Sequence, residues 1–245
     1  MLIKAEGITM DFGGFKAVSD ASLSVERGEI VGLIGPNGAG KSTFFNCLVG
    51  DLRPTQGQVW FDGVDLTNAT PEEHARRGIG RTFQLPATFE DMSILENVMV
   101  GAFLRHPRTQ DATQAAHEIL ELTGLSGLAS QKARSLGTPG RKRLEIARVL
   151  ATQPKLMLLD EALAGLTPVE VQRAIDLVRR IHKTGVTIVI VEHIMEVILS
   201  LTDRVLVFNQ GRVIASGVAA DVVNDPAVIE AYLGRPRTRT RGGTP

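Results

Sequence analysis

Cysteine and large aromatic side chains are scarce in this sequence. Its 245 residues contain one cysteine, Cys47, one tryptophan and one tyrosine. A single cysteine excludes a disulfide within the chain and any multi-cysteine zinc site, and it favours a reducing compartment. No uncharged apolar run approaches the roughly 20 residues that span a bilayer. The charged N-terminal segment, Met1–Glu6, does not resemble a signal peptide, so we expect a chain that is soluble when isolated.

An excess of either charge is also missing. Lysine and arginine together number 27, as do aspartate and glutamate, so the formal net charge is zero. This balance argues against a broad electrostatic surface for nucleic acid. Hydrophobic residues make up 43% of the chain, which at this length predicts one α/β domain, or one domain with a modest subdomain.

Apolar runs and helical patterns alternate along most of the chain, which is typical of an α/β sheet protein. Buried strands are predicted at 30–34, 156–159 and 186–191. A glycine-rich turn follows the first of these strands and leads into a helix predicted at 42–49. A late hairpin is predicted at 205–214, with its turn at 209–211.

Two helix starts and one helical region also stand out. Thr70 and Thr167 are each followed by proline and, three residues later, by glutamate, the pattern of a capping box with proline at the first helical position. Strand patterns are missing between about residues 86 and 134, where 111–125 has an amphipathic helical pattern. We predict a sheet domain at 1–234 with a helical subdomain inserted at approximately 86–150. The tail at 235–245 has no apolar residue and is predicted to be disordered.

The segment 35–42 carries the most informative motif. It matches G-x-x-x-x-G-K-[ST] and lies between a predicted strand and a predicted helix, the context that this phosphate-binding motif requires. Glycines let successive backbone N–H groups face a phosphate chain, and the helix N-terminus adds positive potential. Lys41 is expected to reach the β- and γ-phosphates, and Ser42 to bind Mg²⁺. The expected nucleotide-binding residues are Gly35, Pro36, Asn37, Gly38, Ala39, Gly40, Lys41, Ser42 and Thr43.

Two acidic residues follow the predicted strand at 156–159. Asp160 is expected to hold Mg²⁺, through water or through a shell shared with Ser42, and Glu161 to polarise the attacking water. Alone, two acids at a strand end are more typical of a solvated turn. Together with Lys41 they indicate hydrolysis of a nucleoside triphosphate, with the phosphate loop and the acid pair expected on adjacent strands.

The order of these motifs resembles that of the ATP-binding subunit of ATP-binding cassette (ABC) transporters, over nearly all of the chain before the tail. The resemblance implies an α/β fold, namely a P-loop NTPase of the ABC-type nucleotide-binding domain, with an antiparallel β subdomain and an inserted helical subdomain. It implies that Gln84 contacts Mg²⁺ and water near the docking site of the transmembrane partner. It implies as well that His193 contacts the γ-phosphate and that Phe12 stacks on adenine.

Finer stretches, at 12–18, 80–84, 95–101 and 231–234, resemble the branched-chain amino acid importer branch of the family. The resemblance implies ATP and Mg²⁺ as cofactors and transmembrane permease subunits as partners. It also implies a second ATP-binding subunit in a hetero- or homodimer, a periplasmic solute-binding protein that acts indirectly, and no nucleic acid. The chain is then expected at the cytoplasmic side of the inner membrane, as a peripheral subunit. Related branches handle urea and other amides, which remain alternative solutes.

One loop departs from the family's pattern. Where the family usually has L-S-G-G-Q, or L-S-Y-G-Q in this branch, residues 136–140 read L-G-T-P-G. Gly137 replaces the serine that donates to the γ-phosphate across the dimer, and Pro139 has no N–H. Gly137, Thr138 and Gly140 remain candidate nucleotide contacts, since the following helix N-terminus favours an anion. Either the loop is a tolerated variant, or the chain pairs with a related subunit and one of the two sites hydrolyses ATP slowly.

Other function classes fit the residues less well. A non-transport ABC ATPase would usually add long coiled coils, zinc modules or paired cassettes, which 245 residues with one cysteine do not accommodate. A small-molecule kinase with the same phosphate loop would not account for His193 or for the loop at 136–140. A regulatory subunit that binds ATP without hydrolysing it remains an alternative because of Gly137 and Pro139, although Glu161 and His193 argue against it.

Overall fold

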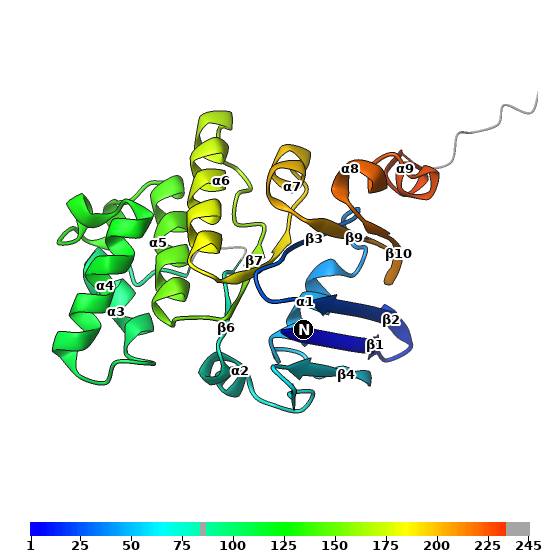
Figure 1. Cartoon of the computed structure of the whole chain (residues 1–245), viewed down its shortest axis with the longest axis horizontal. Coiled ribbons are helices and arrows are strands. Elements are labelled where there is room, and N and C mark those ends of the chain that lie inside the picture. The colour runs from blue at the N-terminus through cyan, green and yellow to red at the C-terminus, as the bar shows by residue number, and fades with distance from the viewer. Residues whose placement is uncertain (84–86, 234–245) are drawn as a thin grey trace, which may run out of the picture.

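The structure of the protein is a computed structural model that describes residues 1–83 and 87–233 (Figure 1). It contains a four-stranded sheet with the order β2-β1-β4-β5 and a six-stranded sheet with the order β10-β9-β3-β8-β7-β6. The strands of the smaller sheet are β1 (Ile3–Phe12), β2 (Phe15–Val25), β4 (Gln56–Phe61) and β5 (Val64–Asp65). The strands of the larger sheet are β3 (Ile30–Ile34), β6 (Ile79–Arg81), β7 (Leu156–Asp160), β8 (Thr187–Val191), β9 (Arg204–Asn209) and β10 (Arg212–Gly217).

Helices follow most of these strands. They are α1 (Lys41–Leu48), α2 (Pro71–Arg77), α3 (Ile94–Ala102), α4 (Thr109–Thr123), α5 (Thr138–Ala151), α6 (Pro168–Lys183), α7 (Met195–Leu201), α8 (Ala219–Val222) and α9 (Pro226–Leu233), with short 3-10 helices at Ser126–Leu128 and Ala133–Ser135. In the part of the chain that the structure describes, none of these helices combines the length and the apolar character that crossing a bilayer requires. The strands, the first helix and the hairpin predicted from the sequence are all present, with small shifts at their ends.

Two apolar cores cover the two faces of the larger sheet. The first core surrounds α1 and joins the two sheets, and it fully buries Phe44, Phe45 and Leu48. The second core lies on the opposite face, beneath α6 and α7. Alternate residues of the buried strands therefore face different cores, as the pleat of a doubly covered sheet requires.

The strands β3, β8, β7 and β6 are parallel neighbours, so their carboxyl ends lie at one edge of the larger sheet. Because β8 lies between β3 and β7, the expectation that the phosphate loop and the acid pair follow adjacent strands is wrong. All residues of β8 are buried and β-branched, a composition suited to the centre of a sheet that is covered on both faces. The interposed strand ends shortly before His193.

The helices α3, α4 and α5 pack together in a helical layer beside the sheets (Figure 1). This layer has its own apolar core, in which Ile94, Leu120 and Leu144 are fully buried. Among the described residues between 87 and 134, β pairing is limited to one isolated bridge, which agrees with the helical character expected there. The limits of the helical subdomain, approximately 86–150, stay a prediction, and the tail at 235–245 lies outside the described residues.

Both predicted capping boxes are present. The Thr70 hydroxyl accepts a hydrogen bond from the Glu73 N–H at 3.3 Å, and the Glu73 carboxylate accepts one from the Thr70 N–H at 2.7 Å. The Glu170 carboxylate accepts from the Thr167 N–H at 2.8 Å in the same way. Such boxes satisfy N–H groups that the first helical turn leaves without an intrahelical acceptor. They explain why α2 and α6 begin where the sequence predicts.

The close approach of α3 to α5 leaves no room for a side chain at Gly101. A β-carbon there would lie 2.2 Å from the Arg148 carbonyl oxygen and 3.2 Å from the Ala151 β-carbon. Gly101→Ala is therefore expected to force the helices apart and to lower the free energy of unfolding, measured by urea titration, by roughly 1–3 kcal/mol. Gly127→Ala is the matched control, because a β-carbon there would meet nothing within 4 Å. Equal unfolding midpoints for the two variants would contradict the tight packing.

Candidate functional site

The candidate phosphate loop joins β3 to α1. Lys41 is the first residue of α1, and it is buried at 7% exposure. Its Nζ donates to the carbonyl oxygens of Gly35, at 2.7 Å, and Pro36, at 3.0 Å. Burial lowers the pKa of Lys41, and the carboxylates of Glu161 and Asp160 oppose this shift. The ammonium group is thus held by the loop itself, near two acidic side chains.

Two positions of the loop require glycine. Gly35, with φ of +146°, and Gly40, with φ of +100°, lie in backbone regions that other residues avoid. A β-carbon would lie 2.2 Å from the Phe208 carbonyl oxygen at Gly35, and 2.4 Å from the Ala17 carbonyl oxygen at Gly40. Gly40 is also the N-cap of α1 and provides no capping side chain. The first N–H groups of α1 can therefore donate to an anion.

A cleft of about 500 Å³ lies over this loop. It is lined by Phe15, Ala17, Asn37, Gly38, Ala39, Gly40, Lys41, Ser42, Thr43 and Glu161. The cleft brings the predicted phosphate loop together with the glutamate that is predicted to activate water. The remaining loop residues, Gly35 and Pro36, do not line the cleft themselves. Their carbonyl oxygens accept hydrogen bonds from Lys41, which does.

The aromatic side chain that lines this cleft is Phe15. Phe12, the residue predicted to stack on adenine, is its partner across the turn of the β1–β2 hairpin and is not among the lining residues. Phe15 is 70% exposed and Phe12 is 50% exposed. Either ring can stack on a planar base. Both phenylalanines lie in the stretch 12–18, but no role was predicted from the sequence for Phe15. The side of the hairpin on which each ring lies depends on the geometry of the turn.

Glu161 follows β7 directly, in an unusual backbone conformation. Its φ is +47°, and it is one of five non-glycine residues with a positive φ in the described part of the chain. The Glu161 N–H donates to the Val191 carbonyl oxygen at 2.9 Å, and Lys142 Nζ donates to the Glu161 carbonyl oxygen at 3.2 Å. A positive φ is costly for a residue with a side chain, so these contacts hold a conformation that the isolated segment would avoid.

Asp160 is held in place by the end of β6 and the segment that follows it. The Thr82 hydroxyl accepts from the Asp160 N–H at 3.1 Å, and Arg81 Nη2 donates to the Asp160 carboxylate at 3.3 Å. The Arg81 guanidinium also pairs with Asp51 and lies 4.9 Å from the ring centroid of Phe83. Burial raises the pKa of Asp160, and the Arg81 guanidinium lowers it. No sequence motif indicated these supporting residues.

The oxygen donors near the loop suit Mg²⁺. The Ser42 hydroxyl and the Asp160 carboxylate are the hard ligands that this cation prefers, usually completed by water and substrate phosphate oxygens. Among the described residues no three His, Cys, Asp or Glu side chains cluster as metal ligands. Gln84, the third predicted ligand and a predicted catalytic residue, lies outside the described residues.

His193 and Glu192 follow β8. His193 is exposed, whereas Glu192 is buried at 1% exposure. Glu192 Oε1 accepts from the Leu163 N–H at 2.9 Å, and its Oε2 has no hydrogen-bond partner among the described residues. Burial raises the pKa of Glu192. Sequence reasoning missed this acid, because its burial beside the turn after β7 follows only from the fold.

The loop that departs from the family's pattern begins α5. Gly137 is the N-cap of α5 and Thr138 is its first residue. Gly140 packs against Leu136, where a β-carbon would lie 3.0 Å from Leu136 Cδ2. In the described part of the chain, Gly137, Thr138 and Gly140 do not line the cleft over the phosphate loop. The fold therefore does not bring these candidate contacts to the phosphate loop of their own chain.

A groove of about 370 Å³ lies between the sheets and the helical layer. Its lining includes Phe83, Val100 and Leu104, which are 50%, 41% and 36% exposed. Glu145 of α5 accepts from the Phe83 N–H at 2.7 Å, and burial raises the pKa of Glu145 to about 7. Arg148 of α5 adds a cation to the same lining. Exposed apolar side chains gathered on a groove are typical of a contact surface.

Known proteins share these features. Residues 18–164 match the family model for ABC transporters, and residues 212–237 match the model for branched-chain amino acid ATP-binding cassette transporters. The chain is 37% identical to the high-affinity branched-chain amino acid transport ATP-binding protein BraF of Pseudomonas aeruginosa, over 95% of this chain and 98% of that protein. It is 40% identical to the corresponding protein LivG of Escherichia coli K12, over the same shares of the two chains.

Solved structures share the fold. A nucleotide-free ATP-binding cassette from an ABC transporter has a TM-score of 0.87 and 34% identity, covering 96% of this chain and 99% of that chain. The ADP conformation of the cassette MJ1267 has the same TM-score and identity. These comparisons confirm the resemblance and the fold class that the sequence predicts. The chain belongs to the ABC transporter family, of which it is an ATP-hydrolysing cassette.

Proposed function

We propose that this protein is the ATP-hydrolysing subunit that powers a membrane importer of branched-chain or other hydrophobic amino acids. The observation that carries the proposal is the cleft in which the phosphate loop meets Glu161. The match at residues 212–237 and the names of BraF and LivG support the solute class. Urea or another amide is the alternative solute. In either case the solute contacts the permease and not this chain.

ATP is assigned to the cleft over the phosphate loop. Backbone N–H groups of residues 37–43 and the Lys41 ammonium would bind the β- and γ-phosphates. Glu161 would orient the attacking water and accept its proton as the water oxygen approaches phosphorus. His193, at the end of β8, would contact the γ-phosphate, and Gln84 the water. Phe15 and Phe12 would bound the space for adenine at the rim.

Mg²⁺ is assigned to Ser42 and Asp160, with Gln84 as the third predicted ligand. The bound cation would neutralise charge on the β- and γ-phosphate oxygens. Arg81 would orient the Asp160 carboxylate, and Thr82 would hold the Asp160 backbone through its N–H. The acid would then be preorganised before nucleotide binds.

The groove between the sheets and the helical layer is assigned to the transmembrane permease. An apolar surface of that partner would cover Phe83, Val100 and Leu104. Phe83 precedes Gln84, and its N–H donates a hydrogen bond to Glu145 of α5. A movement of the permease against Phe83 would therefore be transmitted both to Gln84, the proposed water contact, and to α5.

The chain would act at the cytoplasmic side of the inner membrane as a peripheral subunit, with a periplasmic solute-binding protein acting only through the permease.

The position of α5 supports pairing with a second ATP-binding subunit. The N-terminal residues of α5, Gly137 and Thr138, lie outside the cleft of their own chain, so the corresponding helix of a partner would complete that cleft. Gly137 and Pro139 favour a heterodimer over a homodimer, since a related partner would supply the missing donors. ATP on Lys41 would then be hydrolysed with the partner's loop, and ATP on the partner with the weaker loop of this chain.

Removal of the candidate general base tests the function directly. Glu161→Gln keeps the shape of the side chain and removes its basicity, so steady-state ATPase activity of the assembled complex should fall about 10- to 100-fold, to the slow turnover at the partner's site. ATP binding, measured by equilibrium titration, should persist. Glu118→Gln, at an exposed position of α4, is the matched control and should leave turnover unchanged. Substantial turnover in Glu161→Gln would contradict the assignment.

The two phenylalanines of the hairpin can be separated by nucleotide affinity. Because Phe15 lines the cleft and Phe12 does not, Phe15→Ala should raise the Kd for ATP by about tenfold, as expected for a lost aromatic contact. Phe12→Ala should have the smaller effect. Calorimetric titration of the purified chain measures both, with Phe103→Ala, exposed but outside the cleft, as control. A larger effect of Phe12→Ala would reverse the assignment of the adenine contact.

Repair of the altered loop should raise ATP turnover. A β-carbon at Gly137 would lie 3.9 Å from the nearest neighbouring atom, so Gly137→Ser fits, and Pro139→Gly restores an N–H. A charge-assisted donor contributes roughly 1.5–3 kcal/mol, so the double variant should increase the ATPase rate of the chain alone about 10- to 100-fold. Gly127→Ser, where a β-carbon meets nothing within 4 Å, is the control. An unchanged rate in the repaired chain would mean that the loop is a tolerated variant.

A further inference from the structure

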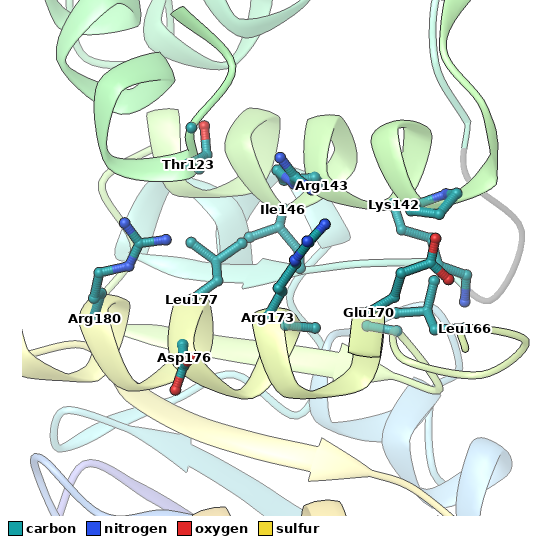
Figure 2. Close-up of a pocket in the computed structure, with 14 residues that line it drawn as sticks. Thr123, Lys142, Arg143, Ile146, Leu166, Glu170, Arg173, Asp176, Leu177 and Arg180 are labelled. Atoms are coloured by element: carbon teal, nitrogen blue, oxygen red, sulfur yellow. The ribbon is translucent and has the colours of Figure 1, made fainter. Parts of the chain in front are cut away.

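A second cleft, of about 350 Å³, lies between α5 and α6 (Figure 2). It uses other residues of α5 than the permease groove does, namely Pro139 of the altered loop, Lys142, Arg143 and Ile146. Its apolar lining comes from both helices and from the turn between β7 and α6, and consists of Ile146, Ala162, Leu166, Ala174 and Leu177. Neither the phosphate loop nor the permease groove accounts for this cleft.

Three arginines line the cleft, of which Arg143 is half-buried and Arg173 and Arg180 are exposed. Arg173 and Arg180 extend from α6 towards α5, and Arg143 lies on α5 opposite them (Figure 2). In the part of the chain that the structure describes, none of the three guanidinium groups forms an ion pair or a hydrogen bond. Arg143 Nη1 lies 3.9 Å from where a β-carbon of Gly124 would be, beside the C-terminus of α4. The partial negative charge of that helix end stabilises Arg143 in this position without neutralising it.

The two acidic residues of the lining offset part of the positive charge of these arginines, and only Asp176 points away from the cleft (Figure 2). Hydrogen bonds from Thr167 and, after them, the Arg173 guanidinium lower the pKa of the Glu170 carboxyl. The Glu170 carboxylate accepts from the N–H and the hydroxyl of Thr167, both at 2.8 Å, and so caps α6. Asp176 lies on the side of α6 away from α5, where its Oδ1 is 3.7 Å from Arg179 Nη1 (Figure 2). The lining therefore carries four basic side chains, Lys142, Arg143, Arg173 and Arg180, against two acidic ones over an apolar floor, an arrangement that favours an anion.

We propose that this cleft binds a small amphipathic anion, with a carboxylate or phosphate head and a short apolar body. A guanidinium group matches the planar, bidentate geometry of carboxylate and phosphate oxygens. The apolar floor, with Ile146 and Leu177, covers the body of such a ligand and excludes a purely ionic one. The cleft volume of about 350 Å³ lies at the lower end of the range for small-molecule pockets, which argues against a second nucleoside triphosphate as the natural occupant.

An anion in this cleft bridges two parts of the cassette. Arg143 belongs to α5 of the helical layer, whereas Arg173 and Arg180 belong to α6, which covers the larger sheet. Gly137 is the N-cap of α5, and Lys142, in the same helix, donates to the Glu161 carbonyl oxygen. Simultaneous contact with both helices fixes the loop at 137–140 relative to the end of β7. The ligand thus acts on ATP turnover from outside the nucleotide cleft.

Calorimetric titration of the full chain without nucleotide tests the site and its ligand class. The anionic probes are 4-methylpentanoate and 3-methylbutyl phosphate, and the tighter binder identifies a carboxylate or a phosphate ester as the preferred head. The controls are 4-methylpentanamide, which has the body without the charge, and inorganic phosphate, which has the charge without the body. Saturable binding of an anionic probe, at least about tenfold tighter than both controls, is expected. Absence of binding by both probes, or equal binding of inorganic phosphate, overturns the proposal.

Substitutions test the bridge. Arg143→Gln and Arg173→Gln, one on each helix, should each raise the Kd of the preferred probe at least about tenfold. Arg179→Gln is the matched control, because Arg179 is a neighbouring exposed arginine of α6 that contacts the Ser200 carbonyl oxygen and does not line the cleft. Equal weakening by Arg179→Gln, or no effect of Arg143→Gln, overturns the bridged site. Thermal unfolding verifies each fold, and the nucleotide-free assay keeps the result independent of the proposed ATPase function.

Discussion

The parallel pairing of β3, β8 and β7 is the constraint on which the candidate site depends. Because the carboxyl ends of these strands lie at one edge, the phosphate loop, His193 and Glu161 approach the same region from distant parts of the sequence. The hydrogen bond of 2.9 Å from the Glu161 N–H to the Val191 carbonyl oxygen joins the turn after β7 to β8. It also holds Glu161 at a positive φ that an unsupported turn would abandon. The position of Glu161, the proposed general base, is therefore a property of the whole sheet and not of its motif.

The helix α5 connects the other surfaces of the cassette. Its N-terminus carries the altered loop, and one of its sides lines the permease groove with Glu145. Another side lines, with Arg143, the cleft between α5 and α6, which we call the arginine cleft. Between these sides, Lys142 donates to the Glu161 carbonyl oxygen at 3.2 Å. A packed helix moves as a unit, so an occupant of the groove or of the cleft between α5 and α6 would also act on the position of the loop at 137–140. In this arrangement the permease and a small ligand would influence ATP turnover through the same element.

Local patterns explain how far the sequence could predict this structure. The strand at 30–34, the phosphate loop and the capping boxes at Thr70 and Thr167 depend on neighbours within a few residues, and the sequence predicted all of them. The place of β8 between β3 and β7 depends on long-range pairing, which periodicity does not encode. For the same reason the contacts of Arg81 and Thr82 with Asp160 were not predicted, since β6 and β7 are far apart in the sequence. The arginine cleft was missed because it forms only when α5 and α6 pack.

The altered loop separates the binding of ATP from its hydrolysis. Binding relies on a contiguous, preorganised segment in which Lys41 is already held by two carbonyl oxygens. Hydrolysis also relies on donors that stabilise the transferring γ-phosphoryl group, and the proposed second subunit would supply these. With Gly137 at its N-cap, α5 keeps unsatisfied N–H groups and their positive potential, whereas Pro139 and the missing serine remove directed donors. The positive potential of the α5 N-terminus favours bound ATP and the transition state alike, whereas directed donors favour the transition state. Gly137 and Pro139, where the family usually has serine and glycine in this loop, are therefore expected to reduce ATP turnover more than ATP affinity.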